Sequence, residues 1–185
     1  MGEQVLESLE SLVVVFLRFL SALLALGLVG ACSPAFNWRE LRVDGAPLVA
    51  LLPCKAETAT REVPLTEPPA TLHMHSCDTG GVTFAVAWAK LGSASQAAGA
   101  LEQWKSASLA SVRAPAGAES GWAAVVTRAD EVHGIKAQGL DHRGQALQTQ
   151  AVYFSQGPWV YQAAVYGAQL PEQALTTFFE GLTLP

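Results

Sequence analysis

Residues 146–167 read ALQTQAVYFSQGPWVYQAAVYG, and this stretch decides the fold class. Aliphatic and aromatic residues alternate on both sides of Ser155-Gln156-Gly157-Pro158, whose composition is typical of a turn. A period of two is the signature of a β-strand that buries one face. The stretch therefore predicts a long β-hairpin, and a hairpin predicts an antiparallel sheet.

Further strand patterns precede this hairpin. In VTFAVAWAKL, residues 82–91, large apolar side chains alternate with small ones, so one face is expected to bury Val82, Phe84, Val86 and Trp88 and the other mostly alanines. Similar patterns predict strands at 36–43, 47–53, 72–77, 122–127 and 132–140, and the segment 59–65 is suited to a sheet edge. Turn sequences separate them at 44–45, 78–81 and 141–144.

Two segments have the period of about 3.6 residues that indicates a helix. A capping-box pattern at 93–96 precedes a stripe formed by Ala97, Leu101, Trp104 and Val112, with Ser108 as its small polar member. Residues 171–182, PEQALTTFFEGL, begin with a helix-starting proline and direct Leu175, Phe178 and Phe179 inward. We expect an α+β domain over residues 36–185, in which two main helices cover an antiparallel sheet of about six or seven strands.

Composition limits the class of protein. The chain has 185 residues, of which 50% are hydrophobic and 15% charged, so a disordered or collagen-like chain is excluded. This length is typical of one folded domain with a real core. The net charge of -5 comes without a clustered basic face, so we expect no nucleic-acid partner.

The N-terminal segment predicts export. Residues 19–29, FLSALLALGLV, form an apolar run of signal-peptide length that is too short by itself to span a bilayer, and Arg18 stands just before it. The run ends in Val29-Gly30-Ala31-Cys32, which resembles the lipobox of bacterial lipoproteins. The resemblance implies that residues 1–31 are removed and that the Cys32 thiol receives a diacylglyceryl group. Residues 32–35 would then be a lipidated tether at the periplasmic face of a membrane.

Two alternatives to a cleaved signal peptide stay open. Counted from Leu12, the apolar run covers about eighteen residues broken by Arg18 and Ser21, so it also suits an uncleaved single-span anchor in place of the cleaved signal-peptide helix that is expected to precede the domain. The first residues, MGEQVLESLES, are acidic where a signal peptide is positive, which suggests a true start after Met1. Ser33 resembles the sorting pattern for the outer rather than the inner membrane.

Export changes the interpretation of the two other cysteines. Thiols outside the cytoplasm tend to be oxidised, and a lipidated Cys32 leaves Cys54 and Cys77 as an even pair. Their spacing is too long for a redox motif, and no second cysteine pair suggests zinc. We therefore expect a structural disulfide between Cys54 and Cys77.

Motifs for chemistry are sparse. His73 and His75 flank Met74 in a predicted strand, so both imidazoles are expected on one face, where they either bind copper or zinc or face solvent. Two ligands do not complete a metal site, so no cofactor is predicted. The chain contains no GxSxG, HExxH, P-loop or GxGxxG motif, and Asp130-Glu131 suits a turn better than a catalytic pair. The five tryptophans are expected to pack in the core and at its rim: Trp38, Trp88, Trp104, Trp122 and Trp159.

Two resemblances cover the domain. Residues 36–65 are similar to the first hairpin of PsbP-like domains, and WVYQAAVYG, residues 159–167, followed by a proline-led helix resembles their C-terminal half. The pattern Leu52-Pro53-Cys54, Cys77, Gly81 and Phe84-Ala85 resembles that of small proteobacterial lipoproteins. Members of the broader fold serve mostly as binding or assembly factors.

Fold alone does not fix function, but the predicted anchor, the compact predicted domain and the lack of a catalytic motif favour a non-enzymatic envelope lipoprotein that binds a partner protein or a small ligand. Two alternatives belong to other classes. One is a periplasmic metal-handling protein that uses His73 and His75, and the other is a hydrolase assembled from distant residues.

Overall fold

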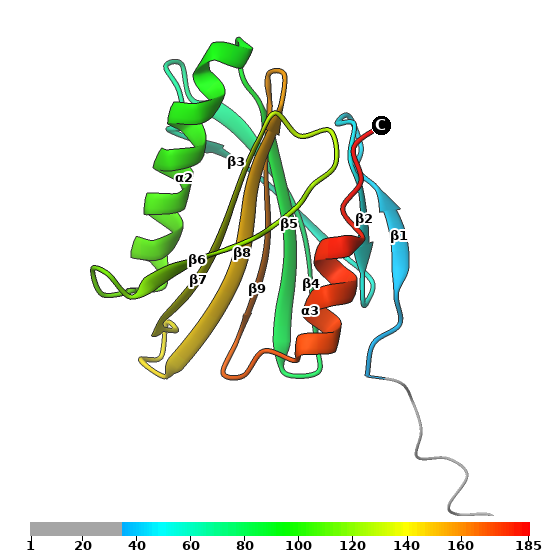
Figure 1. Ribbon diagram of the computed structural model, residues 1–185, viewed down its shortest axis with the longest axis vertical. Coiled ribbons are helices and arrows are strands. Elements are labelled where there is room, and N and C mark those ends of the chain that lie inside the picture. Colours follow the sequence, from blue (N-terminus) through cyan, green and yellow to red (C-terminus); the bar gives the residue numbers. More distant parts are fainter. Residues whose placement is uncertain (1–34) are drawn as a thin grey trace, which may run out of the picture. The chain divides into compact units, whose positions relative to one another are not determined.

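The computed structural model describes residues 35–185, in which Phe36–Pro185 forms one compact unit (Figure 1). The expected signal peptide, Cys32 and the first residues of the tether lie outside the described residues. Within residues 35–185, no helix is long and apolar enough to cross a membrane.

Seven strands form one antiparallel sheet in the order β3-β4-β5-β9-β8-β7-β6. Their bounds are β3 Glu57–Val63, β4 Ala70–Thr79, β5 Val82–Lys90, β6 Glu119–Trp122, β7 Glu131–Leu140, β8 Ala146–Gln156 and β9 Trp159–Gly167. The predicted hairpin is β8 and β9, and it closes at the pair Gln156 and Trp159 around a two-residue turn. The α+β class with about six or seven antiparallel strands and two main helices is confirmed.

Different elements cover the two faces of the sheet (Figure 1). Helix α2 (Ala97–Ser111), which follows the short 3₁₀ helix η1 (Ala94–Gln96), packs on one face. The second face is covered by α3 (Glu172–Glu180) and by a separate hairpin of β1 (Arg39–Arg42) and β2 (Val49–Leu52). Each face has its own hydrophobic cluster, so the sheet is the middle layer of the domain.

The alternation predicted for β5 is confirmed. Val82, Phe84, Val86 and Trp88 belong to the cluster beneath α3, whereas Ala87 and Ala89 belong to the cluster beneath α2. Helix α2 itself lies nearest to β8 and β9. The turn from β4 into β5 is shorter than expected, because only Gly80 and Gly81 lie between the strands, and both have the positive φ that this type of turn requires.

The stripe predicted for α2 is also confirmed. Ala97, Leu101 and Trp104 are buried, and the Ser93 backbone N–H donates to Gln96 Oε1 at 3.1 Å, as a capping box requires. Ser108 faces the sheet, where Gln162 Nε2 donates to its hydroxyl at 3.1 Å and to the Tyr153 hydroxyl at 2.9 Å. The serine thus satisfies a buried amide beneath the helix.

The strand predicted at residues 122–127 is wrong. The strand is β6, which ends at Trp122, where the Ala124 N–H donates to the Trp122 carbonyl at 2.9 Å and turns the chain away from β7. The following residues cross the face of the sheet (Figure 1). Val126 is 5% exposed and packs on the core, whereas Val125 is 81% exposed. The apolar alternation therefore reflects a crossing loop that buries every second side chain.

Candidate binding groove

Cys54 and Cys77 form a disulfide, as the cysteine pattern predicted. Their Cα atoms lie 5.9 Å apart across a sequence separation of 23 residues. Cys54 follows β2 and Cys77 lies in β4, so the bond joins the small hairpin to the main sheet. The bridge accounts for two of the three cysteines in the chain, and Cys32 is the third.

His73 and His75 lie on one face of β4, as predicted, where both rings stack against Trp88 with centroid distances of 5.5 and 5.0 Å. Both are partly buried rather than open to solvent. A hydrogen bond of 3.3 Å joins His73 Nδ1 to Thr60 Oγ1, while His75 Nδ1 is buried without a partner. Within residues 35–185, no group of three or more His, Cys, Asp or Glu is placed to hold a metal ion. The histidine pair therefore packs on an aromatic ring, and nothing adds a third ligand.

Burial makes His75 a source of acid sensitivity. Desolvation lowers the pKa of His75 below its ordinary value of 6.5, nearby His73 lowers it further, and Asp44 opposes both effects. Below pH 6.5 the unfolded chain binds a proton here that the folded chain resists, so this contribution to stability is complete above pH 6.5 and is lost as the pH falls. We expect His75→Phe, which retains a ring on Trp88, to lose less stability than the wild type between pH 7.5 and 5.5.

Urea denaturation at the two pH values measures this difference. The exposed His142 provides the control, because His142→Gln should leave the pH dependence unchanged. Identical pH dependence in His75→Phe and the wild type would show that His75 does not contribute.

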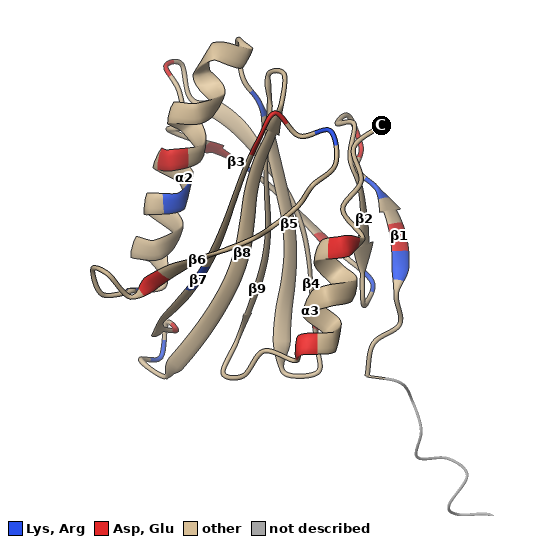
Figure 2. Cartoon of the chain, in the orientation of Figure 1, with Lys and Arg blue, Asp and Glu red and all other residues tan. Residues whose placement is uncertain are grey.

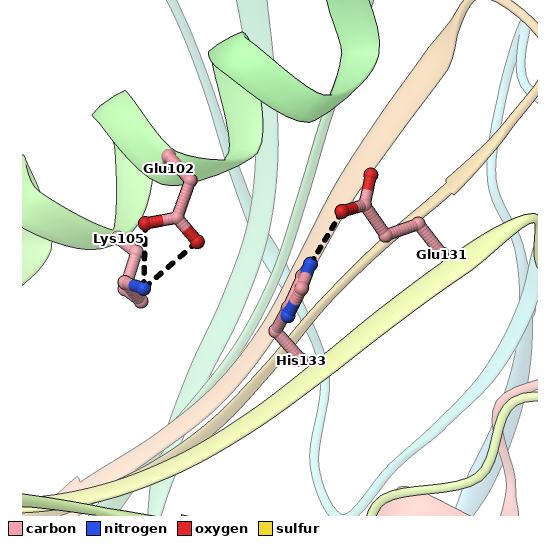
Figure 3. Close-up of polar contacts among 4 residues, drawn as sticks. All are labelled: Glu102, Lys105, Glu131 and His133. Carbon is pink, nitrogen blue, oxygen red and sulfur yellow. Dashed lines mark hydrogen bonds and ion pairs between the residues drawn. The ribbon is translucent and has the colours of Figure 1, made fainter.

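Figure 3 shows an ion pair on α2 and a histidine–glutamate contact on β7. Lys105 Nζ lies 2.6 Å from Glu102 Oε2, and His133 Nε2 lies 2.7 Å from Glu131 Oε1. The hydrogen bond from Lys105 lowers the pKa of Glu102. Each side chain contacts a neighbour on its own element, as Figure 3 shows, so these contacts are local and contribute little to stability.

Asp130 precedes β7, and its carboxylate accepts the Gly157 N–H at 2.7 Å. It therefore supports the β8–β9 turn, as expected for a turn residue, whereas Glu131 is the first residue of β7.

An open groove runs along α3, between this helix and strands β6, β7 and β8. We call it the α3 groove. It consists of two hollows of about 360 and 290 Å³, which share Lys136, Gln150, Glu172 and Leu175. The first hollow adds Ala118, Ser120, Ala137, Gln138, Gln148, Thr149 and Leu170, and the second adds Trp122, Thr176, Phe179 and Glu180. Hollows of this size accommodate small molecules or short chain segments.

The floor of the α3 groove is polar. Lys136 lies opposite Gln150, and Gln138 lies opposite Gln148, in the register of β7 and β8. Residues directly opposite each other in a sheet point to the same face, and residues two apart on one strand do so as well. These four side chains therefore form one patch, which Ser120, opposite Lys136, extends onto β6.

Gln150 is the most deeply buried member of this floor, with 7% of its surface exposed. Its side chain has no hydrogen-bond partner among residues 35–185, although it lines both hollows. The N and O atoms of the carboxamide are not fully buried, so the amide reaches the open space of the groove, where it can bond to water or to a ligand. The Gln150 carboxamide is therefore available to a group that enters the groove.

Trp122 and Phe179 close one end of the α3 groove, with their ring centroids 5.0 Å apart. The indole Nε1 donates to the Ala151 carbonyl at 3.1 Å. This position depends on Gly134, because a Cβ there would lie 2.8 Å from the indole nitrogen. The indole is thus held by packing and by a hydrogen bond.

The groove offers carboxamides, hydroxyls, one ammonium and two carboxylates, and its lining contains no histidine or cysteine. Such groups are able to form hydrogen bonds and ion pairs. Sequence reasoning missed these residues. One signal was available in the sequence. Gln148 and Gln150 occupy the same face of β8 as the apolar residues Val152 and Phe154, so two polar side chains interrupt an otherwise apolar face.

No family model matches the chain. No curated protein matches it either. Among solved structures, it is similar to the crystal structure of a protein of unknown function from Pseudomonas aeruginosa, with a TM-score of 0.36 and 14% sequence identity. The match covers 75% of this chain and 90% of the other. The lipoprotein and PsbP-like resemblances thus stay predictions.

Proposed function

We propose that this protein is an exported lipoprotein, anchored to the outer membrane through Cys32, whose domain binds a partner in the α3 groove without catalysing a reaction. The cysteine pattern carries the proposal. Cys54 and Cys77 form a disulfide, which suits an oxidising compartment, and the remaining cysteine ends the lipobox-like sequence VGAC. Two or three acyl chains on Cys32 would hold the protein stably at a membrane, since each buried CH₂ contributes about 0.8 kcal/mol.

The groove supports binding rather than catalysis. A nucleophile needs a base within hydrogen-bond reach, and the hydroxyl groups in the groove, on Ser120 and Thr176, have no histidine beside them in its lining. By contrast, Gln150 presents an unused donor and acceptor pair. The metal-handling alternative has less support, because His73 and His75 stack on Trp88 without a third ligand in the described part of the chain. No observation favours a hydrolase.

Labelling cells with a clickable fatty acid tests the anchor. The wild type is expected to incorporate the label, and Cys32→Ser is expected to lose all of it, because the thiol is the attachment point. Ser33→Ala is the matched control and should retain the label. Absence of label from the wild type, or equal labelling of Cys32→Ser, would refute the proposal.

A further inference from the structure

We infer that the α3 groove binds an extended peptide segment of about four residues that carries a basic side chain. The inference rests on the binding role proposed above and names the ligand class. Its main support is Gln150, which is 7% exposed, lines both hollows of the groove and has a carboxamide without a hydrogen-bond partner among the described residues.

The floor matches the chemistry of a peptide main chain. A carboxamide has one carbonyl acceptor and an NH₂ donor, which are the complements of a peptide N–H and C=O. Gln148 and Gln150 are two residues apart on β8, so their Cα atoms are about 6.8 Å apart. Alternate residues of an extended peptide repeat at the same distance. Successive glutamines can therefore meet equivalent peptide groups.

Helix α3 forms the wall of the groove, and its length limits the length of the bound segment. Helix α3 has nine residues and is thus about 13.5 Å long. An extended chain rises about 3.3 Å per residue, so about four residues lie along the helix. Leu175 lines both hollows on this wall, and its small exposed part offers an apolar contact to the peptide.

Charge selects for a basic peptide. Glu172 and Glu180 lie near the two ends of α3 (Figure 2), and both line the groove. Lys136 is the cation of the floor, and no ion pair among residues 35–185 neutralises any of these three groups. Two carboxylates against one ammonium leave an excess of negative charge, which attracts a positive partner.

A saccharide fits the groove less well. Sugar rings bind to open aromatic faces, whereas the Trp122 indole packs against Phe179 and uses its N–H to hold the Ala151 carbonyl. The only tryptophan in the groove lining is thus committed to the fold.

An NMR titration tests the inference on the full chain carrying Cys32→Ser in detergent micelles. The probes are the blocked tetrapeptides Ac-Ala-Leu-Lys-Ala-NH₂ and Ac-Ala-Leu-Glu-Ala-NH₂, with triacetylchitotriose as the saccharide. The lysine peptide is expected to shift the ¹⁵N–¹H signals of the Gln150 side chain and of α3 in a saturable manner. The glutamate peptide should bind about fivefold more weakly or worse, because it meets the excess carboxylate charge.

Variants separate recognition from folding. Gln150→Ala is expected to weaken the lysine peptide about tenfold, the equivalent of one hydrogen-bonded contact. The exposed Gln145 gives the matched control, since Gln145→Ala should bind as before. The double change Glu172→Gln and Glu180→Gln should remove most of the preference for lysine over glutamate while the spectrum remains that of the folded domain.

Each contrary outcome has a distinct meaning. No saturable shift with either peptide overturns the peptide inference, and so does tighter binding of the glutamate peptide. If triacetylchitotriose alone shifts the groove signals, the peptide inference is also overturned, but the proposed function of binding a ligand in the α3 groove is kept. Because fatty-acid labelling does not depend on the groove, failure of the anchor is recognised separately.

Discussion

Phe178→Ala is expected to lower the free energy of unfolding by about 3–5 kcal/mol, the range measured for aromatic residues truncated in a core. Phe178 has 0% exposure, and its ring meets Phe84 at a centroid distance of 5.3 Å and Phe179 at 5.1 Å. Truncation leaves a cavity between α3 and the sheet. The same change should loosen the α3 groove, since its wall is this helix.

Urea denaturation followed by tryptophan fluorescence measures the effect of Phe178→Ala. Gln173→Ala provides the control on the same helix, because Gln173 is exposed and its substitution should change stability by less than about 0.5 kcal/mol. A loss of less than about 1 kcal/mol in Phe178→Ala would contradict the docking of α3 on the sheet.

Removing the disulfide is expected to cost about 3 kcal/mol, which is the chain-entropy value for a loop closed across 23 residues. The double variant Cys54→Ser and Cys77→Ser tests this in a Cys32→Ser background, where no third thiol interferes. Reduction of the parent chain by dithiothreitol should give the same loss, and it should not affect the double variant. Equal stability of oxidised and reduced protein would contradict a structural role for the bridge.

Much of the fold could be predicted because its elements have strong local periods. The hairpin at 146–167, the two faces of β5 and the buried stripe of α2 each follow from the spacing of apolar residues. Ser108 is a polar residue in this apolar stripe, and its hydroxyl accepts a hydrogen bond from the Gln162 side-chain amide.

The error at 122–127 has a physical cause. Strand pairing depends on a partner elsewhere in the chain, and a loop that lies on the core also buries alternate residues. Val126 is buried and Val125 is exposed, so the local pattern was that of a strand although the backbone turns away after Trp122.

The α3 groove could not be predicted for a related reason. Its shared lining comes from Lys136 on β7, Gln150 on β8 and Glu172 on α3, which the fold alone brings together. No short motif connects them. The one local sign was that two glutamines, Gln148 and Gln150, occupy the face of β8 that also carries Val152 and Phe154.

Intact mass spectrometry of unreduced protein extracted from native membranes examines the anchor and the disulfide together. We expect a chain that begins at Cys32, carries a diacylglyceryl group there and has no free thiol at Cys54 or Cys77. A chain that retains residues before Cys32, with an unmodified Cys32 thiol, would contradict this expectation.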